Sequence, residues 1–255
     1  MVAETGNVLA IKLNRPSVLN ALRKKTLEEL YAVLNEIGSD QSVRVVIITG
    51  SGDASFCAGG DIKEMKQMGV EEARQFAELA HRVLEKMENL EKPVIAAVNG
   101  FAFGAGCDLA INCDICVASD KAKFGMPSSK LGIITPFGGT QRLPRVVGPR
   151  VAKYMFFTGD IIDAKTALDV GLANVVVPHE FLLASANEMA QHILNQAPIA
   201  VGDIKRLVNF SMKRESLEEG DKLEVDLYSD CFATEDKEEG MKAFLEKRKP
   251  LFKGK

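Results

Sequence analysis

Two glycine-rich segments are the part of this chain best suited to chemistry: FCAGGD at 56–61 and NGFAFGAGCD at 99–108. Each follows a short apolar run, at 45–48 or 93–98, and each leads into a segment with helical spacing. A strand that ends in glycine-rich backbone and begins a helix leaves unpaired N–H groups at that end. Two such turns can direct two N–H donors at one oxygen, which is the geometry of an oxyanion hole.

The elements that must position these turns alternate along the first part of the chain. Four apolar runs predict strands, at 8–13, 45–49, 94–98 and 115–118. Three segments carry apolar residues at helical spacing, at 26–37, 71–90 and 105–112. Strands that alternate with helices in this way predict βαβ units and a mostly parallel sheet.

Beyond Gly132 the pattern becomes mostly helical. One more strand is predicted at 175–178, and helical spacing recurs at 151–157, 164–170, 180–196, 199–213 and 236–249. We therefore expect the sheet core in 1–155, and in 156–255 a helical region suited to packing on another subunit. The sequence contains no repeat, low-complexity tract or Pro/Ser-rich linker.

Composition and charge exclude several classes of protein. The 255 residues are 46% hydrophobic and carry a net charge of −3, so no basic field favours nucleic acid. No apolar run approaches the roughly 20 residues that span a bilayer, and the N-terminus lacks signal-peptide features. These features favour a cytoplasmic protein, or one of an organelle matrix after processing. The five cysteines predict free thiols; the CDIC sequence at 113–116 has no second cysteine pair, so we predict no metal site.

The order of several motifs resembles the crotonase (enoyl-CoA hydratase/isomerase) family. The matching pieces are LNRP at 13–16, NAL at 20–22, FCAGGDIKEM at 56–65, KPVIAAVNG at 92–100, CDI at 113–115, GGTQRL at 138–143, TGD at 158–160, ALDVGL at 167–172 and AFLEKR at 243–248. The resemblance spans essentially the whole chain. It implies an α/β spiral of ββα turns, a C-terminal helical trimerisation region, a homotrimer or a hexamer of paired trimers, and an acyl-CoA thioester substrate with no further cofactor.

The resemblance also assigns roles to residues. It puts the two oxyanion N–H donors on Gly60 and Ala105, where small residues let a thioester approach the backbone. The helix beginning near Ala105 would add a favourable dipole. The residues expected around the CoA and substrate are Ala58, Asp61, Ile62, Lys63, Gly104, Thr135 and Pro136. Lys63 suits a phosphate as a point charge, although a solvated surface lysine is an equal alternative.

The acid and base residues depart from the family pattern. Hydratases of this kind use two glutamates that face the substrate's double bond. The first position is Asp108, which keeps a carboxylate but is one methylene shorter, and the second is Ser128, whose hydroxyl is a poor acid or base. Pro136 replaces a glycine whose N–H helps to hold the water, and proline has no N–H. A carboxyl in an apolar pocket should have a raised pKa, which favours Asp108 as the proton carrier.

His81 is a further candidate for proton transfer. It occupies the place of a base histidine in the family's dehalogenases and can pair with Asp108, or it is a surface histidine of a helix. The walls of the acyl pocket are expected to include Phe101, Phe103, Met126 and Phe137.

Three readings of the function remain open. The leading one is an acyl-CoA enzyme that stabilises a thioester enolate and hydrates, dehydrates or isomerises an enoyl-CoA. A decarboxylase or hydrolase of the same family is an alternative, because loss of carbon dioxide forms the enolate without a base, and Thr135 or Ser128 would then hold the departing carboxylate. A CoA-binding scaffold without catalytic activity is the alternative from a different class.

Overall fold

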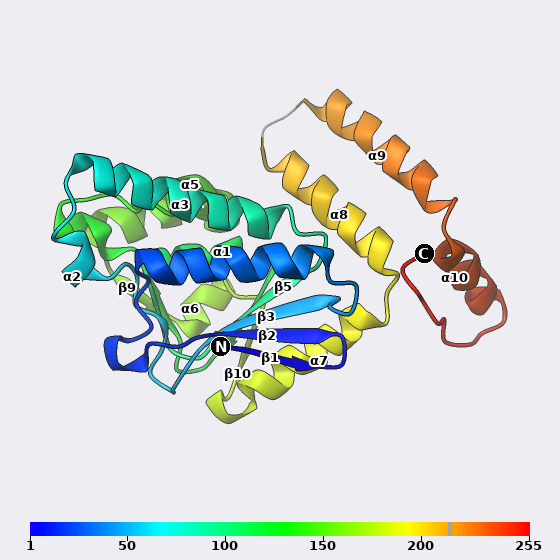
Figure 1. Ribbon diagram of the computed structural model, residues 1–255, viewed down its shortest axis with the longest axis horizontal. Coiled ribbons are helices and arrows are strands. Elements are labelled where there is room, and N and C mark those ends of the chain that lie inside the picture. The colour runs from blue at the N-terminus through cyan, green and yellow to red at the C-terminus, as the bar shows by residue number, and fades with distance from the viewer. Residues whose placement is uncertain (214–215) are drawn as a thin grey trace.

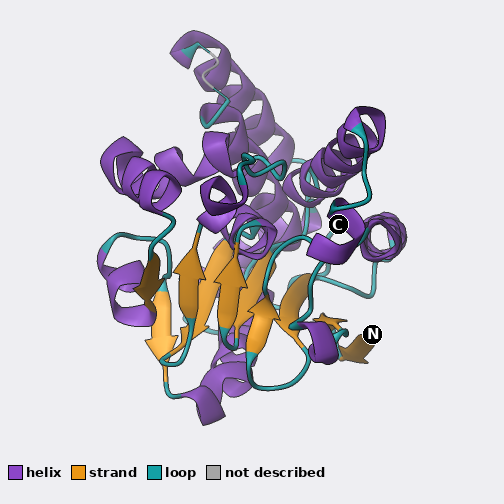
Figure 2. Cartoon of the chain, turned by 90° about the vertical axis from the view of Figure 1, so that its left-hand side faces the viewer, coloured by secondary structure: helices purple, strands orange, loops and turns teal. Residues whose placement is uncertain are grey.

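Two β-sheets form the centre of the molecule (Figures 1 and 2). The computed structural model describes residues 1–213 and 216–255, and the side chains of all of these except 3–5. The larger sheet has the strand order β1 (Val2–Thr5), β2 (Val8–Leu13), β3 (Val45–Gly50), β5 (Val94–Val98), β7 (Ile115–Ser119) and β10 (Val175–Val177). The smaller sheet has the order β4 (Ser55–Cys57), β6 (Phe101–Phe103), β8 (Lys123–Gly125) and β9 (Ile161–Asp163).

The chain passes from the larger sheet to the smaller one in each turn of a spiral. β3 is followed by β4, β5 by β6 and β7 by β8, and neighbouring strands are parallel except in the β1–β2 and β8–β9 pairs. Between turns lie α2 (Ile62–Met65), α3 (Val70–Glu88) and α4 (Ala105–Asn112). This arrangement confirms the predicted α/β spiral of ββα turns.

The remaining helices cover and extend this spiral. They are α1 (Lys24–Ser39), α5 (Gly139–Thr158), α6 (Ala164–Asp169), α7 (Leu182–Leu194), α8 (Pro198–Ser211), α9 (Leu217–Cys231) and α10 (Glu235–Leu245), with 3-10 turns η1 (Pro16–Val18), η2 (Pro127–Leu131) and η3 (His179–Phe181). In the part of the chain that the structure describes, no helix has the length and apolar character needed to cross a bilayer.

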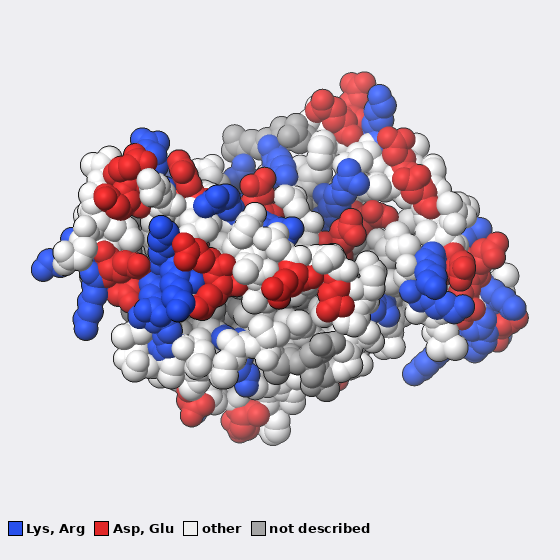
Figure 3. Space-filling model, viewed as in Figure 1, with Lys and Arg blue, Asp and Glu red and all other residues white. Residues whose placement is uncertain are grey.

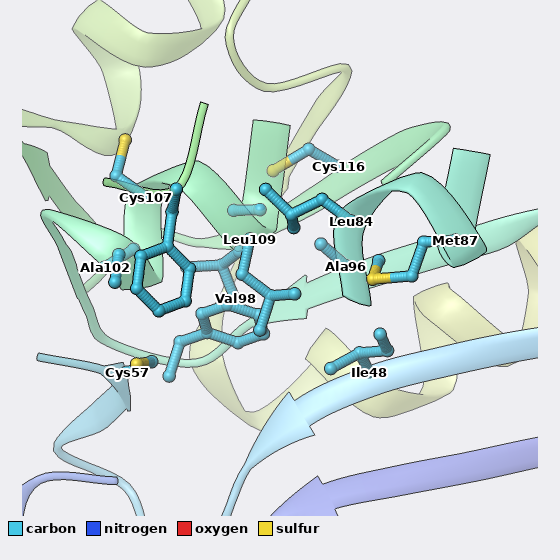
Figure 4. Close-up of a cluster of buried hydrophobic side chains, with 14 of the residues drawn as sticks. Ile48, Cys57, Leu84, Met87, Ala96, Val98, Ala102, Cys107, Leu109 and Cys116 are labelled. Carbon is cyan, nitrogen blue, oxygen red and sulfur yellow. The ribbon is translucent and has the colours of Figure 1, made fainter. Parts of the chain in front are cut away.

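The strands of the larger sheet are buried on both faces, which explains their continuous apolar sequence. In β3, Val46 and Ile48 belong to the main core with α1 and α3, whereas Val45 and Ile47 pack toward α7. Figure 4 shows part of the main core, in which Ile48 lies near Leu84 and Met87 of α3. Both glycine-rich turns therefore rest on a rigid, fully packed layer.

The sheet core extends beyond the predicted boundary at residue 155. That boundary falls inside α5, and β9 still pairs with β8 while β10 completes the larger sheet beside β7. The prediction placed the change too early because β9 has only three residues and because Val175–Val177 stands alone among helical segments.

The last three helices extend away from the core (Figure 1). The α8 helix is fixed to the core by Lys205, which is 9% exposed. Its ammonium donates to the carbonyl oxygens of Met87 and Lys92 at 3.0 and 3.1 Å and pairs with Asp114 at 2.8 Å. Beyond this anchor, α9 and α10 carry much of their apolar surface exposed.

Gly106, in the first turn of α4, allows the two glycine-rich turns to pack against each other. A Cβ at this position would overlap the carbonyl oxygen of Cys57 at the end of β4. We predict that Gly106→Ala lowers the free energy of unfolding by about 1 to 3 kcal/mol, because the backbone must shift to admit the methyl group.

The matched control is Gly38→Ala, on α1. There the nearest atom to the new Cβ, Lys86 Nζ, is 3.9 Å away, and alanine favours the helix by about 0.5 to 1 kcal/mol. Urea unfolding followed by circular dichroism measures both variants. Equal stability of the two variants would contradict the role given to Gly106.

Candidate functional site

The first glycine-rich turn connects β4 to α2. Gly59 has φ +107°, and a Cβ on it would lie 2.9 Å from the carbonyl oxygen of Phe103, so only glycine fits there without strain. Asp61 then caps α2 by accepting a hydrogen bond from the Lys63 N–H at 3.1 Å. The turn thus changes direction at Gly59, directly beside the second turn.

The second turn connects β6 to α4. Gly104 has φ +48°, a conformation that favours glycine, and its N–H donates to the Gly125 carbonyl at 2.9 Å. Ala105 is the first residue of α4, so its N–H has no acceptor within the helix. The helix therefore begins at Ala105, as predicted from the sequence.

Gly60 and Ala105 line one small cavity of about 70 Å³. Among the described residues, neither N–H donates a hydrogen bond to another backbone or side-chain group. The cavity is lined by Ala58, Gly60, Ile62, Met65, Phe76, Gly104, Ala105, Pro127, Ser128, Leu131, Ile133, Ile134, Thr135, Pro136 and Phe137. Two free N–H groups thus lie at one cavity, as the predicted pair of oxyanion donors requires.

Apolar side chains close most of this cavity. Phe76 of α3 and Phe137 meet edge to face with ring centroids 5.7 Å apart. Of the four residues expected as pocket walls, Phe137 lines the cavity, Met126 is fully buried, and Phe101 and Phe103 stack on each other outside the lining. Phe76 was not predicted as a wall, because its helical spacing only indicates core packing.

Asp108 lies on α4 one turn after Ala105 and is completely buried. The hydroxyl of Thr135 donates a hydrogen bond to its Oδ2, and Oδ1 has no partner among the described residues. Burial raises the pKa of Asp108 to about 7, while the Thr135 hydrogen bond and the charge of Arg142 oppose part of this rise. This carboxyl is therefore able to gain and lose a proton near neutral pH.

The glycine pair at the start of α5 makes room for this carboxyl. A Cβ on Gly139 would overlap Asp108 Oδ1, and a Cβ on Gly138 would overlap the guanidinium of Arg142. Arg142 is in turn held by Glu88 of α3, with Nε and Oε1 2.6 Å apart. The GGTQR sequence thus positions a cation close to the buried carboxyl without a direct ion pair.

The other predicted site residues divide into two groups. Ser128, on η2, and Pro136 line the cavity, as do Ala58, Ile62 and Gly104. Asp61 forms an ion pair with Arg15 at 2.9 Å, which gives it a structural function at the turn. Lys63 is exposed on α2, where Figure 3 shows Lys and Arg side chains gathered near α2 and the beginning of α1.

His81 lies away from the cavity. It is exposed on α3, lines a different cavity of about 730 Å³, and has no hydrogen bond to Asp108 in the described part of the chain. The predicted coupling of His81 to Asp108 is therefore not supported. Spacing along a helix could not show that Gly138 and Arg142 stand beside His81, since these residues come from a distant segment.

The cysteines of the CDIC sequence behave as core residues. All five cysteines are free thiols, as predicted. Cys116 lies in the main core, and burial raises its pKa to about 12, so it stays protonated at neutral pH.

Comparison with known proteins agrees with this geometry. The family model described as enoyl-CoA hydratase/isomerase matches residues 3–255. The chain is 46% identical to the short-chain-enoyl-CoA hydratase of Clostridium acetobutylicum, covering 98% of this chain and 95% of that protein. It is 48% identical to the crotonyl-CoA hydratase of Syntrophomonas wolfei, covering 94% and 92% of the two chains.

A solved structure gives the same result in three dimensions. The crystal structure of an enoyl-CoA hydratase from Bacillus anthracis superimposes with a TM-score of 0.96 at 39% identity, covering 100% of this chain and 99% of that one. From the fold, the cavity with its two free N–H groups, and these matches, the chain belongs to the enoyl-CoA hydratase/isomerase family.

Proposed function

We propose that this protein catalyses the reversible addition of water to a short-chain 2-enoyl-CoA thioester. The observation that carries the proposal is the pair of free N–H groups of Gly60 and Ala105 at one cavity. Addition of water to the β-carbon moves charge onto the thioester oxygen, and these two donors are placed to bind that oxygen. The dipole of α4 strengthens the Ala105 donor.

Asp108 is proposed as the proton carrier. It is the carboxyl nearest to the cavity on α4, and its pKa of about 7 suits both uptake and release of a proton at neutral pH. Because Ser128 stands in the place of a second glutamate, one carboxyl must take a proton from water and return it to the α-carbon.

The size and walls of the cavity favour a short acyl group. The Phe76–Phe137 pair lines a space of about 70 Å³, and two similar proteins are named for short-chain and crotonyl substrates. Lys63 and the neighbouring cations near α2 favour the phosphates of CoA at the open side.

The proposal is tested with purified protein and crotonyl-CoA. Hydration removes the absorbance of the conjugated thioester and gives a 3-hydroxyacyl-CoA that mass spectrometry identifies. A 3-enoyl-CoA and a malonyl-type thioester are assayed in parallel, since turnover of only one of these would assign isomerase or decarboxylase activity instead. Binding of acyl-CoA by calorimetry without any turnover would favour the scaffold reading.

We further propose that the chain assembles as a trimer or as paired trimers. The outer surfaces of α8, α9 and α10 expose large apolar side chains that a monomer would leave in water. These include Ile204, Val208, Val225, Tyr228, Phe232, Met241, Phe244 and Leu245.

Asp108→Asn should lower kcat for hydration by about a hundredfold to ten-thousandfold, with little change in KM. The amide has the size of the carboxyl but cannot carry the proton, and Asp108 does not line the cavity that binds substrate. Steady-state kinetics with crotonyl-CoA measures both constants, and a circular dichroism spectrum checks the fold. Hydration at the wild-type rate would remove Asp108 from the mechanism.

The rates of hydration and dehydration should rise together with pH through about 7 and then level off. The pKa of Asp108 is raised to about 7, so its carboxylate form is scarce below that pH and complete above it. The Asp108 carboxylate accepts the first proton in both hydration and dehydration. The pH profiles of the two rates should therefore rise over the same pH range. Assays from about pH 5.5 to about pH 8.5 test this, and profiles with different limbs for the two directions would indicate a second titrating group.

Tyr228→Glu together with Phe232→Glu should reduce the mass of the particle to that of a monomer or destabilise its assembly. Two new charges, one on α9 and one at its C-cap, would be desolvated in an interface but harmless in water. Light scattering after size exclusion measures the mass. The control is Val70→Glu at the start of α3, which is 85% exposed and should leave the mass unchanged. Equal masses for all three proteins would exclude α9 from the interface.

A further inference from the structure

The side chain of Thr135 connects the proposed proton carrier to the substrate cavity. Asp108 is completely buried and absent from the cavity lining, whereas Thr135 lines the cavity and is only 4% exposed. The Thr135 hydroxyl donates a hydrogen bond to Asp108 Oδ2. Any proton that passes between Asp108 and the cavity by this hydrogen bond must pass through the hydroxyl oxygen of Thr135.

The other described residues that line the cavity offer little alternative to Thr135 for proton transfer. Ser128 and Thr135 are the polar side chains among the residues that line the cavity, and no carboxylate belongs to that lining. Ser128 has no side-chain hydrogen bond to a carboxylate among the described residues, and Pro136 has no N–H. Asp108 is one methylene, or about 1.5 Å, shorter than a glutamate at this position, and Thr135 donates its hydrogen bond to the carboxyl from the cavity lining.

We propose that Thr135 is a catalytic residue that relays protons between Asp108 and the substrate; this inference rests on the proposed hydration. A hydroxyl has one donor hydrogen and two acceptor lone pairs. While its hydrogen is directed at Asp108, its lone pairs are available to a water molecule in the cavity. Thr135 alone is too weak a base, but it becomes effective when it gives its proton to Asp108 as it accepts one.

The steps balance in atoms and charge. The water oxygen forms a bond to the β-carbon while one water O–H bond breaks and its proton moves to the Thr135 oxygen. The Thr135 proton moves to Asp108 Oδ2, and the electrons of the double bond move onto the thioester oxygen held by Gly60 and Ala105. Asp108 then returns its proton to Thr135, whose other proton moves to the α-carbon. The enolate collapses to the 3-hydroxyacyl thioester, and both residues are restored.

The groups that surround Asp108 do not compete for this proton. The thiols of Cys57, from β4, and Cys107, from α4, both lie close, and burial raises their pKa to about 12 and well above the usual value, respectively. Arg142 of α5 supplies a positive charge and is paired with Glu88 of α3, while His81 of α3 lies near Gly138 and outside the cavity.

Thr135→Val and Thr135→Ser test the relay. Valine keeps the shape of threonine without the hydroxyl, so kcat for crotonyl-CoA should fall by about a hundredfold to ten-thousandfold at every pH, with KM little changed. Serine keeps the hydroxyl, so Thr135→Ser should stay within about tenfold of the wild type. Thermal unfolding shows whether each variant is folded.

The pH profile separates a relay from mere positioning. The Thr135 hydrogen bond lowers the pKa of Asp108, so its loss raises that pKa and shifts the carboxylate form to higher pH. If Thr135 only positioned Asp108, Thr135→Val would regain wild-type kcat above the new pKa, and this recovery would overturn the proposal. A relay predicts that the loss persists at high pH.

A double-mutant cycle provides a second measure. In a relay, Asp108→Asn and Thr135→Val interrupt the same path, so the double variant should be no slower than the slower single variant. Losses of kcat that multiply in the double variant would show independent functions and would overturn the relay.

Exchange of the α-protons of butyryl-CoA with deuterated water distinguishes failure of the relay from failure of the proposed function. This reaction needs enolate stabilisation and a proton carrier but no hydration, and NMR follows it directly. Exchange that is lost in Thr135→Val without any hydration by the wild type would support the relay and reject the proposed function. Hydration by the wild type together with an active Thr135→Val variant would support the proposed function and reject the relay. Absence of both hydration and exchange in the wild type would reject both the proposed function and the relay.

Discussion

The contact between the carbonyl of Cys57 and Gly106 is the constraint on which the site depends. It joins the end of β4 to the first turn of α4 so closely that a side chain at Gly106 would not fit. Because the two turns belong to adjacent strands of the smaller sheet, this contact also fixes the relative position of Gly60 and Ala105. The relative position of the two turns is therefore a property of backbone packing, and the proposed oxyanion site needs no side chain to hold the reacting oxygen.

A second constraint follows from the cost of burying charge. The completely buried Asp108 has one oxygen that accepts from Thr135 and one without a partner among the described residues, and its pKa is raised because burial disfavours the charged form. Gly138 and Gly139 leave just enough room for the carboxyl and for Arg142 nearby. In the proposed mechanism, the chain keeps two backbone N–H donors for the oxyanion, while proton transfer depends on this one buried carboxyl.

The strands and helices with long apolar patterns could be predicted from sequence, because several apolar residues in each element repeat the same spacing. β3, β5 and α3 all appear within a few residues of their expected limits. The strands of the smaller sheet have only three residues each and form through pairing between distant segments, so periodicity cannot reveal them. The α9 helix also escaped prediction, although Ser216 and Glu219 form a capping box at its start.

The two glycine-rich turns could be predicted from the sequence because clustered glycines indicate an unusual backbone conformation. The partnership of Asp108 with Thr135 could not be predicted, because 27 residues separate the two and no local pattern links them. Phe76 was likewise hidden, since a buried phenylalanine on a helical stripe has the same appearance whether it faces core or cavity. Contacts between side chains from different turns of the spiral can be identified only once the three-dimensional stacking of those turns is known.

The Lys205 anchor has a consequence for biosynthesis. Its ammonium meets the carbonyl of Met87 and the carboxylate of Asp114, which in turn accepts from the Val94 N–H at the start of β5. The start of β5, which precedes the second glycine-rich turn, therefore depends on a lysine that lies more than ninety positions after Asp114. Until the ribosome has synthesised the chain through Lys205, Asp114 lacks this cation, so the packing around the start of β5 is completed only after α8 has been made.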